Sequence, residues 1–191
     1  NTAAIYLYSQ AGGLTVAPSG NDGSFNSSPD NVYIITVGGT NFSTDSIWAS
    51  STTGNNLDLT APNYSSYTTL NNGGYGSDNG GTCTSAAIVS GVAALIWSVN
   101  PSLSPAQVTL YLQQGADDKG TPGWDSTYGY GRVNALNSVN LASGGGISTT
   151  TTLTSNLNPS IWGQSVTFTA TVAPAAASGK ASALHTFVKV V

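Results

Sequence analysis

The chain has 191 residues, which is enough for one domain or for one domain and part of another. Only 6% of the residues are charged and the formal net charge is −4. Four Lys and Arg residues in all cannot form a phosphate-neutralising surface, so a nucleic-acid partner is excluded. The single cysteine excludes an intrachain disulfide and a cysteine-based metal cluster.

The first half of the chain alternates between helix and strand patterns. Residues 3–10 predict a helix that ends at Gly12 and Gly13. Three short β-rich runs predict strands; these are residues 14–17, residues 32–37 before Gly38-Gly39, and residues 57–59 before Ala61-Pro62. Residues 64–76 predict a loop or hairpin. Strands that alternate with helices favour a parallel sheet.

A long apolar helix is predicted next, at residues 84–100, and it is apolar on almost every side, which is typical of a helix buried all round. Ser90, Gly91 and Ser98 interrupt its apolar run, so we interpret it as a core helix and expect no membrane span. A second helix is predicted from Pro105, with Ser104 as its N-cap. Its expected apolar face is Val108, Leu110, Tyr111 and Leu112; a loop-rich stretch at residues 115–131 and a short helix at residues 133–141 follow.

The only cysteine, Cys83, stands where a glycine-rich loop turns into the long apolar helix. The start of a helix has unsatisfied backbone N–H groups and the positive end of the helix dipole, which favour a thiolate and can hold a developing oxyanion. Cys83 is therefore a candidate nucleophile. The alternative is a buried, inert thiol.

Several motifs in a fixed order carry a family resemblance. They are Ser-Gly-Asn-Asp-Gly at residues 19–23, Val-Gly-Gly-Thr at 37–40, Leu-Asp-Leu-Thr-Ala-Pro at 57–62, Gly-Thr-Cys-Thr-Ser at 81–85 and Gly-Tyr-Gly-Arg-Val-Asn-Ala at 129–135. With these motifs, residues 1–142 resemble the C-terminal portion of the catalytic domain of subtilisin-like serine proteases, the peptidase S8 family. The resemblance implies an α/β fold, with a partial subtilisin-like parallel sheet, flanking helices and a buried central helix.

The resemblance also implies roles for individual residues. In this family a nucleophile attacks the scissile carbonyl, and the oxyanion is held by the nucleophile's backbone N–H and an asparagine amide. Cys83 matches the nucleophile position and Asn21 the oxyanion donor. Pro18, Ser19 and Gly20 match the backbone that lines the pocket for the residue before the scissile bond. Without the resemblance, Asn21 is a turn residue and the other three form an ordinary loop.

The chain departs from the family at several positions. Cys83 replaces the serine, and a thiolate in a site shaped for serine is expected to act poorly on amides. Ala87 and Ile88 stand where Pro-His is usual, and Asn63 where glycine is usual. The family's catalytic Asp and His are expected before residue 1, and the only histidine, His185, is expected to be an exposed strand residue. The fragment by itself is therefore expected to be inactive.

The composition and the residue pattern of the sequence change after residue 142. Residues 143–148 predict a Gly/Ser linker. Beyond it, polar and apolar residues alternate with a period of two, and residues 149–191 resemble the opening strands of a bacterial immunoglobulin-like repeat. Because a complete sandwich of this type needs about 100 residues, we expect a truncated module, a short β-sandwich fragment.

We therefore predict a fragment of a secreted or cell-surface endopeptidase that acts on polypeptides, without a cofactor and without a metal ion. The oligomeric state stays open. The main alternative is a non-catalytic pseudoprotease that serves as a cell-surface binding module. An adhesin segment and a sedolisin-type peptidase are weaker alternatives, because the first leaves the oxyanion loop without a purpose and the second has Asp at the position of Asn21.

Overall fold

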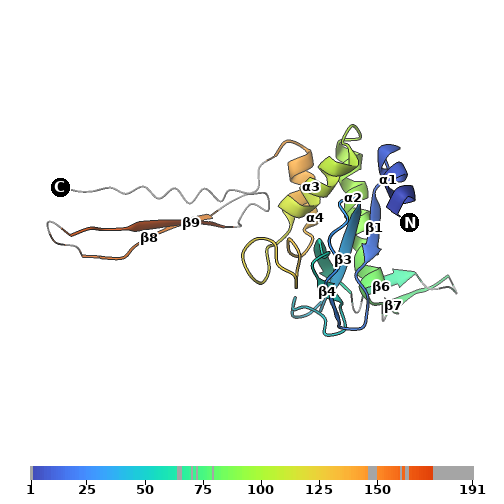
Figure 1. The fold of residues 1–191 in the computed structure, drawn as a ribbon, viewed down its shortest axis with the longest axis horizontal. Helices are drawn as coiled ribbons and strands as arrows, with labels where there is room; N and C mark the ends of the chain where they lie inside the picture. Colours follow the sequence, from blue (N-terminus) through green and yellow to red (C-terminus); the bar gives the residue numbers. More distant parts are fainter. Residues whose placement is uncertain are drawn as a thin grey trace.

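The computed structural model describes residues 2–63, 66–69, 71, 73–78, 80–145, 150–159, 161 and 164–173. Its centre is a three-stranded sheet with the order β1-β3-β5, formed by β1 (Thr15–Pro18), β3 (Ile34–Thr40) and β5 (Leu59–Pro62) (Figure 1). Both strand pairs are parallel, as predicted. The carboxyl ends of the strands therefore meet along one edge, where parallel sheets commonly place their functional residues.

Four helices accompany the sheet in the described part of the chain. They are α1 (Thr2–Gln10), α2 (Thr82–Val99), α3 (Pro105–Gly115) and α4 (Ala135–Ala142). The central helix α2 packs on all three strands and on α3 and α4. The core between them includes Val37, Leu59, Val89, Ile96 and Leu112, each almost completely buried.

Two strands run further than the sequence predicts. β3 continues through Gly38-Gly39, and β5 continues through Ala61-Pro62. The glycines serve close packing rather than a turn, because a Cβ at Gly38 would lie 3.1 Å from Ser51 Oγ, and the Gly39 N–H donates to that same oxygen. The prediction of strand ends at these positions was therefore wrong.

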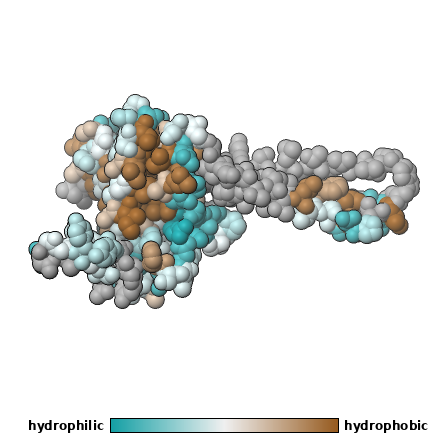
Figure 2. Space-filling view, turned by 180° about the vertical axis from the view of Figure 1, so that it is seen from behind, coloured by the Kyte–Doolittle hydropathy of each residue, from teal (hydrophilic) through white to brown (hydrophobic). Residues whose placement is uncertain are grey.

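The prediction that α2 is buried all round is also wrong for the described residues. Its outward side chains include Ala87, Ala94, Leu95 and Val99, and Leu95 is 51% exposed. Apolar residues gather on the face of the body that is turned away from the viewer in Figure 1, as Figure 2 shows. By length and composition alone, α2 is long and apolar enough to span a membrane. Its contacts with the sheet are those of a core helix.

The second helix of the sequence analysis begins as predicted. Ser104 is the N-cap of α3 and Pro105 its first residue. Gln107 completes a capping box that the prediction missed, since its side chain accepts from the Ser104 N–H. Of the expected apolar face, Val108 and Leu112 are buried, whereas Leu110 is 40% exposed.

Two antiparallel hairpins complete the described structure, beside a short parallel pair β2 (Phe25–Asn26) and β4 (Thr53–Gly54). β6 (Ser66–Thr69) and β7 (Tyr75–Asp78) form one hairpin, at the place predicted for a loop or hairpin. β8 (Thr150–Ser155) and β9 (Phe168–Ala173) form the other, which extends away from the α/β body (Figure 1). The predicted sandwich stays a prediction, because part of the linker and residues 174–191 lie outside the described residues.

Candidate active site

The loop after β1 is bonded to the first residue of α2. Asn21 Oδ1 accepts hydrogen bonds from the Thr82 backbone N–H at 2.8 Å and from Thr82 Oγ1 at 3.0 Å. Because the N–H can only donate, the amide oxygen must face α2, and Nδ2 points elsewhere. Among the described residues, none accepts a hydrogen bond from Nδ2. Asn21 therefore keeps an amide donor free beside the start of the helix.

Gly81 makes this approach possible. A Cβ at Gly81 would overlap the Asn21 side chain, so the residue before Thr82 has to lack a side chain. Gly20 has a φ of 121°, a left-handed backbone conformation that favours glycine. The two glycines thus let the loop and the helix start come within hydrogen-bonding distance.

The rest of the loop is held by Asp22. Its Oδ1 accepts from Thr52 Oγ1 at 2.6 Å, from the Ser24 N–H at 3.0 Å and from Ser24 Oγ at 2.7 Å. The hydrogen bond from Thr52, joined by those from Ser24, lowers the pKa of Asp22 to about 2. Asp22 is therefore ionised at all ordinary pH values and acts as the anchor of a tight turn.

Cys83 is the second residue of α2, and its side chain is exposed. The alternative that Cys83 is buried is therefore wrong, whereas its reactivity stays a prediction. The N-cap residue Gly81 offers no side chain to the first turn of α2, where the Thr82 N–H donates to Asn21 Oδ1 and the Thr84 N–H to the Gly81 carbonyl. On the next residues, Ser85 Oγ donates to the carbonyl oxygens of Ala61 at 2.9 Å and Pro62 at 3.3 Å, which ties the first turn to the end of β5.

Thr82 is a residue that the sequence analysis missed. Its side chain is fully buried, and its hydroxyl lies 3.3 Å from both the N–H and the carbonyl oxygen of Gly20. It therefore joins β1, Asn21 and α2 at one point. A signal was present in the sequence, since Thr82 directly precedes the candidate nucleophile in the Gly-Thr-Cys run.

Replacing Thr82 by valine is expected to lower the free energy of unfolding by about 1–2 kcal/mol, because it leaves Asn21 Oδ1 and the Gly20 carbonyl with fewer donors at nearly unchanged volume. Urea unfolding of the chain measures the loss. Thr82→Ser is the matched control, since it keeps the hydroxyl, and it should retain most of the stability. A valine variant as stable as the serine variant would contradict this role.

Pro18 is the last residue of β1, one residue beyond the predicted strand, and Ser19 and Gly20 lead from it to Asn21. The Ser19 N–H donates to the Val37 carbonyl at 2.9 Å, which extends the pairing with β3 by one residue. Ser19 Oγ is buried and has no hydrogen-bond partner among the described residues. These residues lie at the carboxyl edge of the sheet, next to Asn21, where a substrate-lining role would require them.

Asn63, where the family usually has glycine, follows β5. It is fully buried, and neither of its amide atoms has a hydrogen-bond partner among the described residues. Its side chain lies against Gly39, where a Cβ would approach Asn63 Nδ2 to 2.7 Å. In a buried position, an amide without a hydrogen-bond partner costs about 1–3 kcal/mol.

A buried carboxyl lies toward the other end of the sheet. Asp58 Oδ2 accepts from the Thr36 N–H at 2.8 Å, and Oδ1 accepts from Gln113 Nε2 at 3.3 Å. Burial raises the pKa of Asp58 to about 7, and the charge of Asp30 adds to the rise, while the hydrogen bonds oppose it. Asp58 therefore takes up a proton on folding between its ordinary pKa and neutral pH.

This shift predicts a pH dependence of stability. The folded state binds more protons than the unfolded state between about pH 4 and pH 7, so the stabilisation is complete below about pH 4 and is lost as the pH rises through 7. At alkaline pH the free energy of unfolding is expected to be lower by up to about 4 kcal/mol. Asp58→Asn should reduce this dependence of the free energy of unfolding on pH. Urea unfolding at pH 5 and pH 8 measures it. Asp30→Asn, which removes only the exposed neighbour, should flatten it slightly, and equal pH slopes for Asp58→Asn and the unmodified chain would contradict the assignment.

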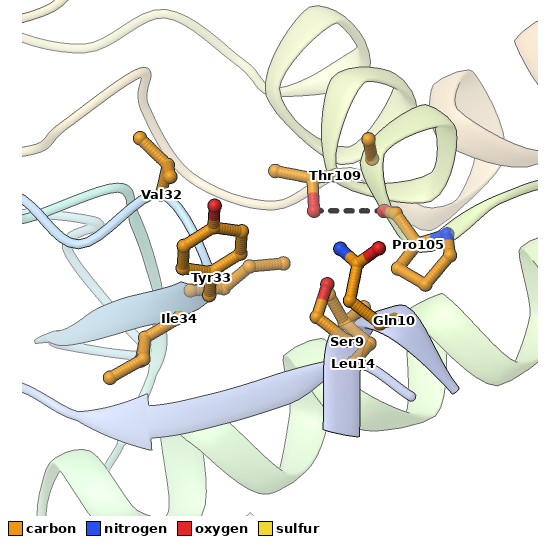
Figure 3. Close-up of a pocket in the computed structure, with 10 residues that line it drawn as sticks. Ser9, Gln10, Leu14, Val32, Tyr33, Ile34, Pro105 and Thr109 are labelled. Carbon is orange, nitrogen blue, oxygen red and sulfur yellow. Dashed lines mark hydrogen bonds between the residues drawn. The ribbon is translucent and has the colours of Figure 1, made fainter. Parts of the chain in front are cut away.

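A separate cavity lies away from this edge. It has a volume of about 290 Å³ and lies among α1, α3 and the amino ends of β1 and β3 (Figure 3). Its lining includes Gln10, Tyr33 and Thr109, and Thr109 Oγ1 donates to the Pro105 carbonyl at 3.0 Å. Because Asn21 and Cys83 lie at the carboxyl ends of the strands, this cavity is no part of the candidate active site.

The closing motif at residues 129–135 is structural. The Thr60 N–H donates to the Gly131 carbonyl, and the Val133 N–H donates to the Thr60 carbonyl. Arg132 forms ion pairs with Asp45 at 2.8 Å and Asp117 at 2.6 Å. The motif therefore attaches the loop of residues 115–131 to β5. None of these contacts reaches Asn21 or Cys83.

The chain is similar to known proteins over most of its length. The model of the subtilase family matches residues 2–131. The chain is 37% identical over 130 residues to subtilisin amylosacchariticus of Bacillus subtilis subsp. amylosacchariticus, covering 65% of the chain and 33% of that protein. It is 34% identical over 134 residues to alkaline elastase YaB of Bacillus sp. (strain YaB), covering 69% and 34%.

Two further similarities extend the comparison. The chain is 38% identical over 69 residues to an extracellular serine protease of Serratia marcescens, covering 36% of the chain and 6% of that protein. The structure of the prenylagaramide maturation protease PagA superimposes with a TM-score of 0.64 and 25% identity, covering 75% of this chain and 55% of that one. The chain thus spans about a third of the length of the two Bacillus relatives, and its parallel sheet with flanking helices is part of a subtilisin-like fold.

Proposed function

Because the chain belongs to the subtilase family, we propose that the whole protein hydrolyses peptide bonds by acyl transfer, with Cys83 as nucleophile and Asn21 as oxyanion donor. The observation that carries the proposal is the pair of hydrogen bonds from Thr82 to Asn21 Oδ1. Within the described part of the chain they leave the Asn21 amide N–H groups without an acceptor and hold them beside the residue that precedes Cys83.

The proposed reaction has two steps. The Cys83 thiolate attacks the scissile carbonyl, a C–S bond forms, and the negative charge moves to the carbonyl oxygen. Asn21 Nδ2 and the backbone N–H at the helix start donate to that oxygen. The C–N bond then breaks, the leaving amine takes a proton from a general acid, and water hydrolyses the thioester.

The acid and base come from outside the described residues. No histidine lies among them, and the only histidine of the chain, His185, is outside that part. In the family that the chain resembles, the orienting Asp and the catalytic His precede the oxyanion asparagine in chain order. Among the described residues the thiol has no histidine for proton transfer, and the proposal is therefore that this chain by itself does not hydrolyse peptides.

We further assign Pro18, Ser19 and Gly20 to the pocket for the residue before the scissile bond. Their position beside Asn21 supports this, since a substrate whose carbonyl oxygen reaches Asn21 passes over the preceding backbone. The partner is a polypeptide. No cofactor or metal ion enters the proposed reaction.

The domain organisation belongs to the same proposal. Residues 1–142 form the C-terminal portion of the peptidase domain, residues 143–148 a linker and residues 149–191 a truncated immunoglobulin-like module. The antiparallel pairing of β8 and β9 supports the last assignment. The protein acts outside the cell, as the name of the Serratia marcescens relative states for that protein.

A second candidate is a non-catalytic binding module with a protease fold. Cys83 in place of the family's serine favours it. The two functions differ in one experiment, in which the whole protein is incubated with casein before and after alkylation with iodoacetamide. A protease loses its activity when Cys83 is alkylated, and a binding module cleaves nothing in either sample.

A further inference from the structure

The hairpin of β6 and β7 carries an exposed aromatic surface. Tyr67 pairs with Ser77, and Tyr75 lies two residues before Ser77 on the same strand, so both tyrosines share one face of the hairpin. Their ring centroids are 6.3 Å apart and the ring planes differ by 9°. Tyr67 is nevertheless 76% exposed and Tyr75 67% exposed. We call these two rings the tyrosine pair.

The hairpin leads directly to the candidate nucleophile. β7 ends at Asp78 and α2 begins at Thr82. From Asp78 to Cys83 the chain can span at most ~17 Å, since an extended chain advances about 3.4 Å per residue. An extended substrate with its scissile bond at Cys83 therefore reaches the hairpin within a few residues. Figure 1 shows the hairpin projecting from the body, beside the start of α2.

From this continuity we propose that the tyrosine pair binds the polypeptide substrate and selects an uncharged, apolar or aromatic side chain a few residues from the scissile bond. The inference rests on the proposed function for the identity of the occupant. Tyrosine supplies large contact area at little conformational cost, and both rings are largely exposed.

The backbone and the charge of the hairpin fit the same occupant. β6 and β7 pair only with each other among the described strands, so each has an edge at which an extended peptide can add as a further strand. Between residues 63 and 82 the only charged residue is Asp78. A charged substrate side chain would find no ion partner on the tyrosine pair, whereas an apolar one would lose exposed surface there.

The test is peptide binding to the chain, measured by fluorescence anisotropy without turnover. The probes are two fluorescein-labelled octapeptides of alanine and threonine, identical except for a central phenylalanine in one and aspartate in the other. The phenylalanine peptide should bind about three- to ten-fold more tightly. The double variant Tyr67→Thr with Tyr75→Thr, which keeps residues that favour strands, should remove the difference.

Two controls separate binding from folding. Tyr67→Phe with Tyr75→Phe keeps the ring faces and should keep the preference. Leu136→Ser removes a 69% exposed apolar side chain from α4 and should leave binding unchanged. The proposal is overturned if neither peptide saturates the unmodified chain below about 1 mM, if the threonine variant keeps the preference, or if the tyrosine pair serves only self-association of the chain.

The outcome is independent of catalysis. Phenylalanine-selective binding to the tyrosine pair by a protein that cleaves no peptide would contradict the proposed function and leave this inference standing. Peptide hydrolysis that depends on Cys83, without any effect of the threonine variant on peptide preference, would overturn this inference alone.

Discussion

Replacing Cys83 by alanine is expected to reduce peptide hydrolysis by the whole protein by on the order of 10⁴-fold, or to the assay background. Removal of the attacking atom leaves only substrate binding and oxyanion stabilisation, which account for a small part of the rate of such enzymes. The measurement is the initial rate on a chromogenic peptide, with urea unfolding of the same variant as a check of the fold. Because Cys83 is exposed, the alanine should change stability little.

The matched variant is Cys83→Ser, which restores the nucleophile usual in the family. If the natural protein is a cysteine peptidase, its activity is sensitive to iodoacetamide and the serine variant is active but insensitive. An inactive natural protein with an active serine variant would instead identify a non-catalytic module. Unchanged hydrolysis in Cys83→Ala would contradict the assignment of the nucleophile.

Replacing Asn21 by alanine is expected to lower kcat by about 10²- to 10³-fold with little change in KM. The loss corresponds to about 2.7–4 kcal/mol of transition-state stabilisation, a magnitude transferred from the asparagine donor of subtilisin, a member of the same family. The reason is that Asn21 Nδ2 would donate to charge that develops only in the transition state. Steady-state kinetics of the whole protein on one peptide separates kcat from KM.

Asn21 also has a structural bond, so the variant needs two controls. Asn26→Ala removes an asparagine whose Oδ1 accepts from Ser28 N–H in an exposed turn, and it should not change kcat. Thr82→Val removes one hydrogen bond to Asn21 but keeps the Asn21 amide, so it should lower kcat by less than Asn21→Ala does. Because both changes act on one hydrogen-bonded unit, the double variant should lose less than the product of the two effects. A rise in KM at constant kcat would contradict the oxyanion role.

The secondary structure was predicted well where its signal lies in neighbouring residues. The helix at Pro105 has an N-cap and a proline in its first turn, and both are readable from four adjacent residues. The strand ends were less predictable. Gly38 and Gly39 are common turn residues, but here the close approach of Ser51 and Asn63 requires small residues inside the strand β3.

The exposure of side chains was the least predictable property. The apolar pattern of α2 is that of a helix surrounded by other elements, yet Leu95 and Val99 remain exposed in the described structure. The hydrophobicity of a side chain indicates that its burial is favourable, but only the positions of the neighbouring elements decide whether the side chain is buried. The same holds for Cys83, because a free cysteine is usually buried and this one is exposed.

For the candidate site, the sequence by itself determined the motif order, the alternation of strands and helices, and the place of Cys83 at a helix start. These follow from neighbouring residues, whose spacing and backbone preferences act locally. Only the tertiary structure decided that Thr82 bonds Asn21, 61 residues away, and that no described residue accepts a hydrogen bond from the Asn21 amide N–H groups. Such a contact depends on the register of β1 against β3 and on the packing of α2 over both strands, and local spacing contains neither.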